Sequence, residues 1–237
     1  MRYSDWEPIY EEILKDFGFD RKKDEEAARV ALEIISHKRS NERSVKKKIE
    51  ELIKGKIAII CGNAPCLERD IKERGKKQEL GIFSFPRVCV VIAADGATSV
   101  LLRNAIIPDL VGTDLDGNIA DIIYANRLGS IIVVHAHGDN VAMLKKVLPA
   151  LNENVICTTQ SKPLSPYRAC GVAGQSPTVY NFGGFTDGDR CVFLAEEFGA
   201  KRIELIGFDF EDEHVSERKK KKLKWAKRLI GDRLFLL

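Results

Sequence analysis

The stretch SIIVVHA, residues 130–136, is a near-continuous run of apolar, mostly β-branched residues that ends beside a histidine. Strands that face water on one side alternate apolar and polar residues, whereas strands covered on both faces do not alternate. Runs of the same kind recur along the chain: KIAIIC (56–61), RVCVVIAA (87–94), PDLVG (108–112), NVICTT (154–159), TVYNF (178–182) and RIELIGFDF (202–210). Together these runs predict a mostly parallel sheet that is buried on both faces.

Helical patterns separate these runs and also precede them. Between the strands, helices are predicted near residues 66–76, 97–105, 117–127, 140–150 and 187–198. Residues 4–53 repeat apolar positions every three or four residues, which predicts two or three helices, the last at about 42–53. Strands that alternate with helices form doubly wound sheets. We therefore predict an α/β fold: an N-terminal helical segment (1–53), a doubly wound catalytic domain (54–212) and a basic C-terminal helix packed on it (213–237).

Composition excludes several classes of protein. No run reaches the roughly 18 apolar residues that a membrane-spanning helix needs, and the acidic, amphipathic N-terminus does not resemble a secretory signal. We therefore expect a cytoplasmic protein without membrane contact. The six cysteines contain no C-x-x-C pair, so buried thiols are favoured over a zinc site.

Positive charge is concentrated near the C-terminus. The net charge is +3, but residues 218–228, RKKKKLKWAKR, contain eight Lys or Arg and no acid. One interpretation is the solvated face of a terminal helix whose buried stripe is Leu223, Trp225, Ala226, Leu229 and Ile230. The other is weak attraction of a polyanionic ligand, with nucleic acid the less favoured partner.

The segment PDLVGTDLDG, residues 108–117, places Asp114 and Asp116 directly after a predicted strand. An EF-hand loop counted from Asp114 would need Gly at position 6 and Glu at position 12, where this chain has Ile119 and Ala125. The calcium-loop interpretation therefore fails, and a turn or half of a magnesium site remains. In the second case, Gly112 and Gly117 are expected to let the backbone bend both carboxylates toward one ion.

Other strand ends carry polar groups too. Asp95 in AADGATS (93–99) is either a helix N-cap or a ligand, and HAHGDN (135–140) places two histidines on one side of an extended chain. In NFGGFTDGDR (181–190), Thr186 and Asp189 have the spacing of a capping box, and Arg190 suits a phosphate. The long loop 159–177 is typical of lids and binding loops.

All these side chains are predicted to lie at one edge, because the carboxyl ends of parallel strands meet there. The set comprises Asp95, Asp114, Asp116, His135, His137, Asp139, Asp187, Arg190 and Asp209. Clustered carboxylates repel one another unless a cation or hydrogen bonds compensate, and Mg²⁺ commonly bridges carboxylates and substrate phosphates. The sequence therefore favours a magnesium-dependent enzyme that acts on a nucleotide phosphate chain.

Four motifs in order carry a family resemblance. GTDLDG (112–117), VHAHGDN (134–140), NFGGFTDGDR (181–190) and LIGFDF (205–210) resemble the archaeal 6-hydroxymethyl-7,8-dihydropterin pyrophosphokinase family, which has a thiamine pyrophosphokinase-like core. The resemblance covers about residues 54–212. The first loop departs from it: GNAPCLE (62–68) has Ala64 and Cys66 where the family often has Gly and Ser, which puts a serine hydroxyl contact in doubt.

The resemblance implies transfer of a diphosphate from ATP to the hydroxymethyl oxygen of a reduced pterin, with release of AMP, in tetrahydromethanopterin or folate-type pterin biosynthesis. It also implies a homodimer, for which the N-terminal helices would offer a surface. The site residues that we predict comprise Asp95, Asp114 and Asp116 for Mg²⁺; Asp114, Asp116, His137 and Asp139 for catalysis; and Gly62, Asn63, Asn140, Gly183, Gly184, Thr186, Asp187 and Arg190 for ATP.

Three other functions fit parts of the pattern. A thiamine pyrophosphokinase would use the same edge with another acceptor. A sugar-nucleotide-handling protein like the motility-associated relatives is disfavoured by the length of 237 residues. A non-catalytic nucleotide- or nucleic-acid-binding module would rely on the basic segment 218–228 instead of on Asp116.

Overall fold

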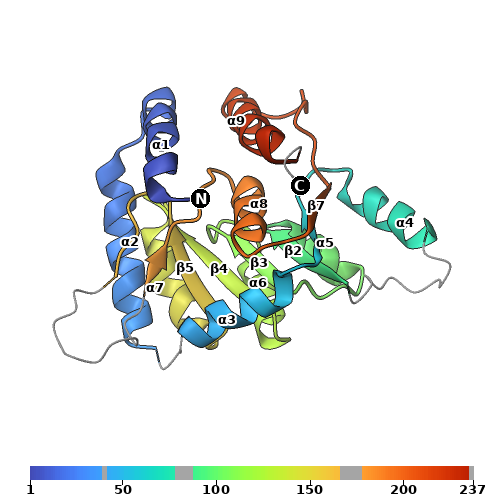
Figure 1. The fold of residues 1–237 in the computed structure, drawn as a ribbon, viewed down its shortest axis with the longest axis horizontal. Coiled ribbons are helices and arrows are strands. Elements are labelled where there is room, and N and C mark those ends of the chain that lie inside the picture. Colours follow the sequence, from blue (N-terminus) through green and yellow to red (C-terminus); the bar gives the residue numbers. More distant parts are fainter. Residues whose placement is uncertain (39–41, 78–87, 166–177, 235–237) are drawn as a thin grey trace.

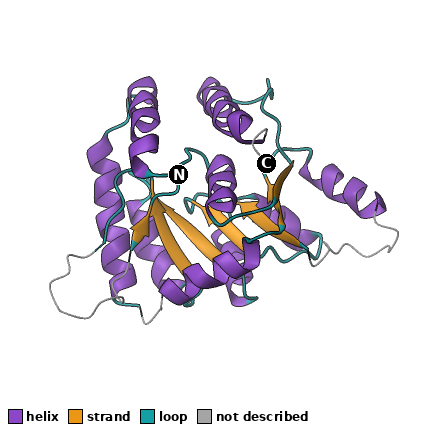
Figure 2. Ribbon diagram, in the orientation of Figure 1, coloured by secondary structure: helices purple, strands orange, loops and turns teal. Residues whose placement is uncertain are grey.

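The structure is a computed structural model that describes residues 1–38, 42–77, 88–165 and 178–234. A twisted sheet lies at its centre and helices cover both of its faces (Figure 1 and Figure 2). The strands are β1 (Ile57–Cys61), β2 (Cys89–Ala94), β3 (Leu110–Thr113), β4 (Ile131–Ala136), β5 (Val155–Thr159), β6 (Val179–Tyr180) and β7 (Arg202–Ile206). The helices are α1 (Tyr3–Phe17), α2 (Arg21–Ser36), α3 (Glu42–Ile53), α4 (Leu67–Lys77), α5 (Ala97–Arg103), α6 (Ile119–Arg127), α7 (Val141–Val147), the 3₁₀ turn η1 (Leu148–Ala150), α8 (Asp187–Glu197) and α9 (Glu217–Leu234).

The strand order is β6-β5-β4-β3-β2-β1-β7, and every pair in this described sheet is parallel. The chain steps one strand at a time from β1 to β6 and then returns across the sheet, so that β7 pairs with β1 on its free side. This return places α8 on the opposite face from α4–α7. The doubly wound α/β fold predicted from the sequence is confirmed.

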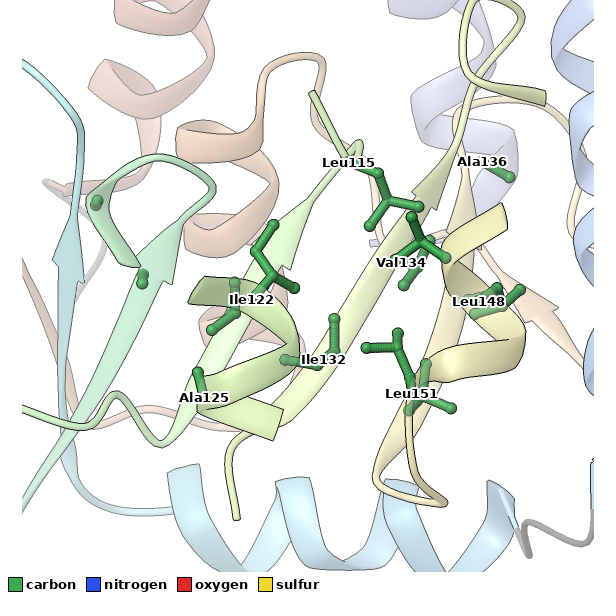
Figure 3. Packing of buried hydrophobic residues seen from close by; sticks show 14 of the residues in the cluster. Leu115, Ile122, Ala125, Ile132, Val134, Ala136, Leu148 and Leu151 are labelled. Atoms are coloured by element: carbon green, nitrogen blue, oxygen red, sulfur yellow. The ribbon is translucent and has the colours of Figure 1, made fainter. Parts of the chain in front are cut away.

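One face of the sheet is covered by α2 and α4–α7, whose apolar side chains pack on β1–β5. Leu115, Ile122, Ile132 and Val134 belong to this layer, and Figure 3 shows their side chains near the central strands on this face, with Val134 beside Leu148. Each Å² of apolar surface that is removed from water contributes roughly 25 cal/mol to the free energy of folding, so such a layer is the main source of stability. The rigid sheet then fixes the positions of the loops at its carboxyl edge.

The other face is covered by α3 and α8, with Ile49, Ile53, Val192 and Leu194 among the buried residues. A third apolar cluster joins α1, α8 and α9: it contains Trp6, Tyr10, Ile13, Leu14, Phe185, Phe193 and Leu229. Helices α1 and α9 therefore share an apolar cluster with α8, close to the loops that follow the strands (Figure 1).

Several local predictions can be compared with the structure. The predicted last strand, 202–210, ends already at Ile206, because Gly207 takes a left-handed φ of 67° that breaks the extended conformation. The basic segment lies in α9, as predicted; of the predicted stripe, Ala226, Leu229 and Ile230 are buried, while Leu223 and Trp225 are only partly buried. Residues 166–177 of the predicted long loop lie outside the described residues. Within the described part of the chain, no helix has the length and apolarity needed to cross a membrane.

Candidate active site

A cavity of about 390 Å³ opens at the carboxyl edge of the sheet. The loops after β1, β2, β3, β4 and β7 form its floor, while the N-terminus of α8 and one face of α9 form its walls. This is the edge where ligands of open parallel sheets bind. The structure therefore places the candidate site at the strand ends that the sequence pattern indicated.

Three carboxylates lie together on the floor of the cavity. Asp95, Asp114 and Asp116 each offer an oxygen within 4.8 Å of the other two. Burial, followed by the neighbouring carboxylates, raises the pKa of Asp95 to about 6, although the Thr113 hydroxyl that donates to Asp95 opposes the rise. Burial and Asp116 likewise raise the pKa of Asp114 to about 6. Three crowded oxygen donors of this kind fit a hard divalent cation such as Mg²⁺.

The glycines beside these acids act differently from our expectation. The backbone turns at Leu115, which has a left-handed φ of 67°, and neither Gly112 nor Gly117 has a positive φ. A side chain at Gly117 would collide with the Asp95 carboxylate, and a Cβ at Gly112 would lie 2.6 Å from the Cys191 sulfur. The prediction that these glycines bend the backbone was therefore wrong: they are needed because Asp95 and α8 pack too closely for a side chain.

Asp95 itself does not cap a helix with its side chain. The N-cap of α5 is Gly96, and no side-chain hydrogen bond is made there. Asp95 instead has a φ of 41°, an uncommon value for a residue with a side chain. Strained backbone of this kind is concentrated at functional sites. The ligand interpretation of Asp95 is favoured over the cap.

The two histidines at the carboxyl end of β4, His135 within the strand and His137 just after it, both line the cavity, as their alternation predicted. His135 is buried; its Nδ1 lies 2.7 Å from the Thr158 hydroxyl, and its Nε2 lies 3.8 Å from Asp187 Oδ1. Arg190 donates to the same Thr158 hydroxyl at 2.7 Å. Burial, and then the Arg190 charge, lower the pKa of His135 well below its usual value. Both effects disfavour the charged imidazolium form of His135.

His137 has a partner that sequence reasoning missed. Asp24, on α2, lies with its Oδ1 3.8 Å from His137 Nδ1, and it accepts hydrogen bonds from the Gly138 amide (2.8 Å) and the Tyr10 hydroxyl (2.6 Å). Burial lowers the pKa of His137, while the Asp24 charge opposes that change. The N-terminal helices thus support a cavity-lining histidine. The only sign of this role in the sequence is that Asp24 falls on the apolar face of the predicted helix, where an acid is unusual.

The N-terminus of α8 forms one wall of the cavity. Thr186 and Asp189 make the predicted capping box, and Asp189 also accepts from the Phe185 and Thr186 amides. Asp187 lines the cavity; burial and Asp114 raise its pKa well above the usual value. Arg190 is buried and lines the cavity too, and its Nη1 has no hydrogen-bond partner in the described structure. A buried, unpaired guanidinium nitrogen beside a helix N-terminus fits an anionic ligand.

Aromatic rings and the first loop also line the cavity, and the Phe208 ring lies beside Gly188 of α8. Phe208 and Phe210 pack together with centroids 5.6 Å apart, and both line the cavity. Asn63 also lines it, and its side chain occupies the space that a Cβ at Gly96 would need. Phe208 and Phe210 were not among the predicted site residues, although the GFDF motif that contains them was noted. They add an apolar surface to an otherwise charged site.

The structure brings together most, but not all, of the predicted site residues. Those that line the cavity are Gly62, Asn63, Asp95, Asp114, Asp116, His137, Thr186, Asp187 and Arg190, with His135 and Asp209. Asp139, Asn140, Gly183 and Gly184 are not among the lining residues. Asn140 is buried and donates to the Asp114 carbonyl (2.6 Å) and the His135 carbonyl (2.8 Å), so it ties two loops together. The catalytic role of exposed Asp139 stays a prediction.

The sequence of the chain is similar to those of a known protein family. Residues 34–214 match the family described as MptE-like, 6-hydroxymethylpterin diphosphokinase MptE-like. The chain belongs to this family. A relative from Methanocaldococcus jannaschii called 6-hydroxymethyl-7,8-dihydropterin pyrophosphokinase is 38% identical to this chain; the alignment covers 98% of this chain and 95% of the relative. A relative of the same name from Pyrococcus furiosus is 39% identical; the alignment covers 97% of this chain and 93% of the relative. A third, from Methanothermobacter thermautotrophicus, shares 41% over 89% of this chain and 79% of its own length. The MptE-like match includes β1–β7 and the residues that line the cavity up to Asp212.

Proposed function

We propose that this MptE-like protein transfers diphosphate from ATP to 6-hydroxymethyl-7,8-dihydropterin, forming the pterin diphosphate and AMP. The observation that carries the proposal is the coincidence of family and site. Relatives named for this activity align along almost the whole chain. The fold of this chain gathers three carboxylates, two histidines and, within the described residues, an unpaired arginine nitrogen in one cavity. We also propose that the protein is cytoplasmic, because ATP and a reduced pterin are available there.

In the reaction, the hydroxymethyl oxygen attacks the β-phosphorus of ATP. A bond forms between that oxygen and the β-phosphorus, the bond from the β-phosphorus to the oxygen bridging to the α-phosphorus breaks, and AMP leaves with that oxygen. The alcohol proton passes to a base or to water. Reactions of this type depend on alignment and charge neutralisation more than on covalent catalysis.

Asp95, Asp114 and Asp116 are the residues that would hold Mg²⁺. When bound, the ion neutralises phosphate charge and polarises the phosphoryl oxygens. The fit rests on the clustering of their oxygens; burial first, and then the neighbouring carboxylates, raise the pKa values of Asp95 and Asp114, and a bound cation would offset both effects.

The other cavity residues would act directly on the substrates. Arg190 offers its free Nη1 to a phosphate oxygen, beside backbone amides at the start of α8. Burial lowers the pKa of His137 although the Asp24 charge opposes this, and its imidazole can accept a proton or donate a hydrogen bond. Phe208 and Phe210 offer ring faces to a planar base or pterin. The homodimer implied by the resemblance remains a prediction.

The test is incubation of the purified protein with ATP, MgCl₂ and the dihydropterin alcohol, with AMP measured by chromatography. We expect AMP and the pterin diphosphate in equal amounts, and none when EDTA is present. Thiamine is the parallel acceptor, because a thiamine pyrophosphokinase would use the same metal and nucleotide groups. Turnover of thiamine without turnover of the pterin would replace the proposed acceptor.

A further inference from the structure

The C-terminal helix takes part in the cavity. Lys219, Lys222, Leu223 and Ala226 of α9 all line it. Their spacing of three, four and seven residues places them on one face of the helix. The positive segment 218–228 therefore presents a defined pair of lysines to the site.

The cations of α9 differ in how they are paired. Lys221 binds Asp16 at 2.8 Å and Arg228 binds Glu12 at 2.9 Å, both across to α1, while Lys220 pairs with Glu217 at 2.8 Å. Lys227 pairs with Glu211. By contrast, neither Lys219 nor Lys222 has a side-chain hydrogen bond or ion pair within the described residues, although the Lys222 ammonium lies 6.0 Å from the centre of the Phe185 ring.

The position of Lys222 relates it to both sides of the site. Its charge opposes the rise in the pKa of Asp114 and contributes to the lowering of the pKa of His137. Lys222 and both of these residues line the same cavity, together with the rest of the carboxylate cluster and Arg190.

We propose that Lys219 and Lys222 bind the β- and γ-phosphates of ATP, so that α9 forms the cationic wall of the nucleotide site opposite Asp95, Asp114 and Asp116. This inference rests on the proposed function in that it takes ATP as the phosphate donor. Two unpaired ammonium groups facing a cavity, on a helix whose other basic side chains are mostly paired, are the observation that carries it. Charge-assisted contacts to phosphate are among the stronger interactions that a lysine makes.

A purely structural role predicts a different behaviour. In that case the lysines would only offset the repulsion among the acids, and their removal would lower stability without discriminating among nucleotides. Contacts to the β- and γ-phosphates must instead affect ATP more than AMP, which lacks both groups. The comparison of ATP with AMP therefore separates the two explanations.

The experiment is isothermal titration calorimetry of the full chain with the magnesium complex of α,β-methylene-ATP, which cannot donate its diphosphate, and with AMP. The variants are the double substitution Lys219→Gln/Lys222→Gln and the charge-retaining Lys222→Arg. The matched control is Lys224→Gln/Lys227→Gln, which removes the same charge from exposed positions of α9 that do not line the cavity.

We expect the Lys219→Gln/Lys222→Gln protein to bind the ATP analogue about tenfold or more weakly, as the loss of charge-assisted hydrogen bonds requires, with AMP affinity nearly unchanged. Lys222→Arg and the control should stay within about threefold of wild type. Equal losses for both nucleotides, no loss, or an equal loss in the control would overturn the inference. The readout needs no turnover, so ATP-analogue binding in a protein that releases no AMP with the pterin would contradict the proposed acceptor alone.

Discussion

Replacing Asp114 by asparagine should stabilise the metal-free protein while it removes magnesium binding. Asp114 lies beside Asp116 and Asp95 with oxygens within 4.8 Å, and its burial makes the charged form unfavourable. Asparagine removes the charge but keeps an oxygen that can accept the hydrogen bond now donated by the Asp116 amide. The variant therefore relieves repulsion without a large change in local structure.

The magnitude follows from the pKa of this carboxyl group. Its rise from 3.8 to about 6 corresponds to at most about 3 kcal/mol, at about 1.4 kcal/mol for each pKa unit. Because Asp114 keeps some contact with water and shares its repulsion with two neighbours, we expect a gain of about 1–3 kcal/mol. A pKa raised on folding means that the wild-type penalty is absent below about pH 4, grows as the pH rises toward 6, and is fully present above it.

The assay is urea unfolding with EDTA at pH 4 and pH 8, followed by circular dichroism. Asp114→Asn should exceed wild type in unfolding free energy at pH 8 and match it at pH 4. Addition of MgCl₂ at pH 8 should stabilise wild type and leave the variant unchanged. Asp5→Asn, at an exposed acid of α1, is the matched control. A variant less stable than wild type at pH 8, or equally stabilised by magnesium, would refute the reasoning.

Three further outcomes are expected. Asp116→Asn should reduce turnover at least about a hundredfold, or about 3 kcal/mol of transition-state stabilisation, and near-wild-type AMP release would contradict its metal role. Thr186→Ala breaks the α8 capping box and should lower the free energy of unfolding in urea by about 1 kcal/mol, with an unchanged value contradicting the cap. Asp24→Asn removes the charge that raises the pKa of His137, so the acid limb of the pH–rate profile should move to lower pH; a limb that stays in place would argue against this pairing.

The strands and the acidic floor of the site could be predicted from sequence because their signals are local. Each buried strand is a short apolar run, and parallel strands bring their carboxyl ends to one edge, so Asp114 and His137 were identified without knowledge of any contact. The limits of β7 were less accurate. Its apolar run continues to Phe210, but the left-handed backbone at Gly207 ends the strand at Ile206.

Contributions from outside the sheet could not be predicted in the same way. Asp24 reaches His137 from α2, across more than a hundred residues of sequence, and Lys222 reaches the cavity from α9. The sequence does not distinguish either residue from its neighbours, because Asp24 is followed by two other acids and Lys222 lies among other lysines. The packing of α2 on the sheet places Asp24, and the packing of α9 with α1 and α8 around Trp6 and Phe193 places Lys222.

That packing, together with the pairing of β7 with β1, sets the order in which the chain can be completed during synthesis. Trp6 and Tyr10 emerge from the ribosome first, yet Phe193 and Leu229, which cover them, emerge near the end. One edge of β1 likewise stays unpaired until β7 has been made. Strands β1–β6 can pair as they are made, whereas the nascent chain exposes an unpaired strand edge and two aromatic side chains until almost all of it has been translated.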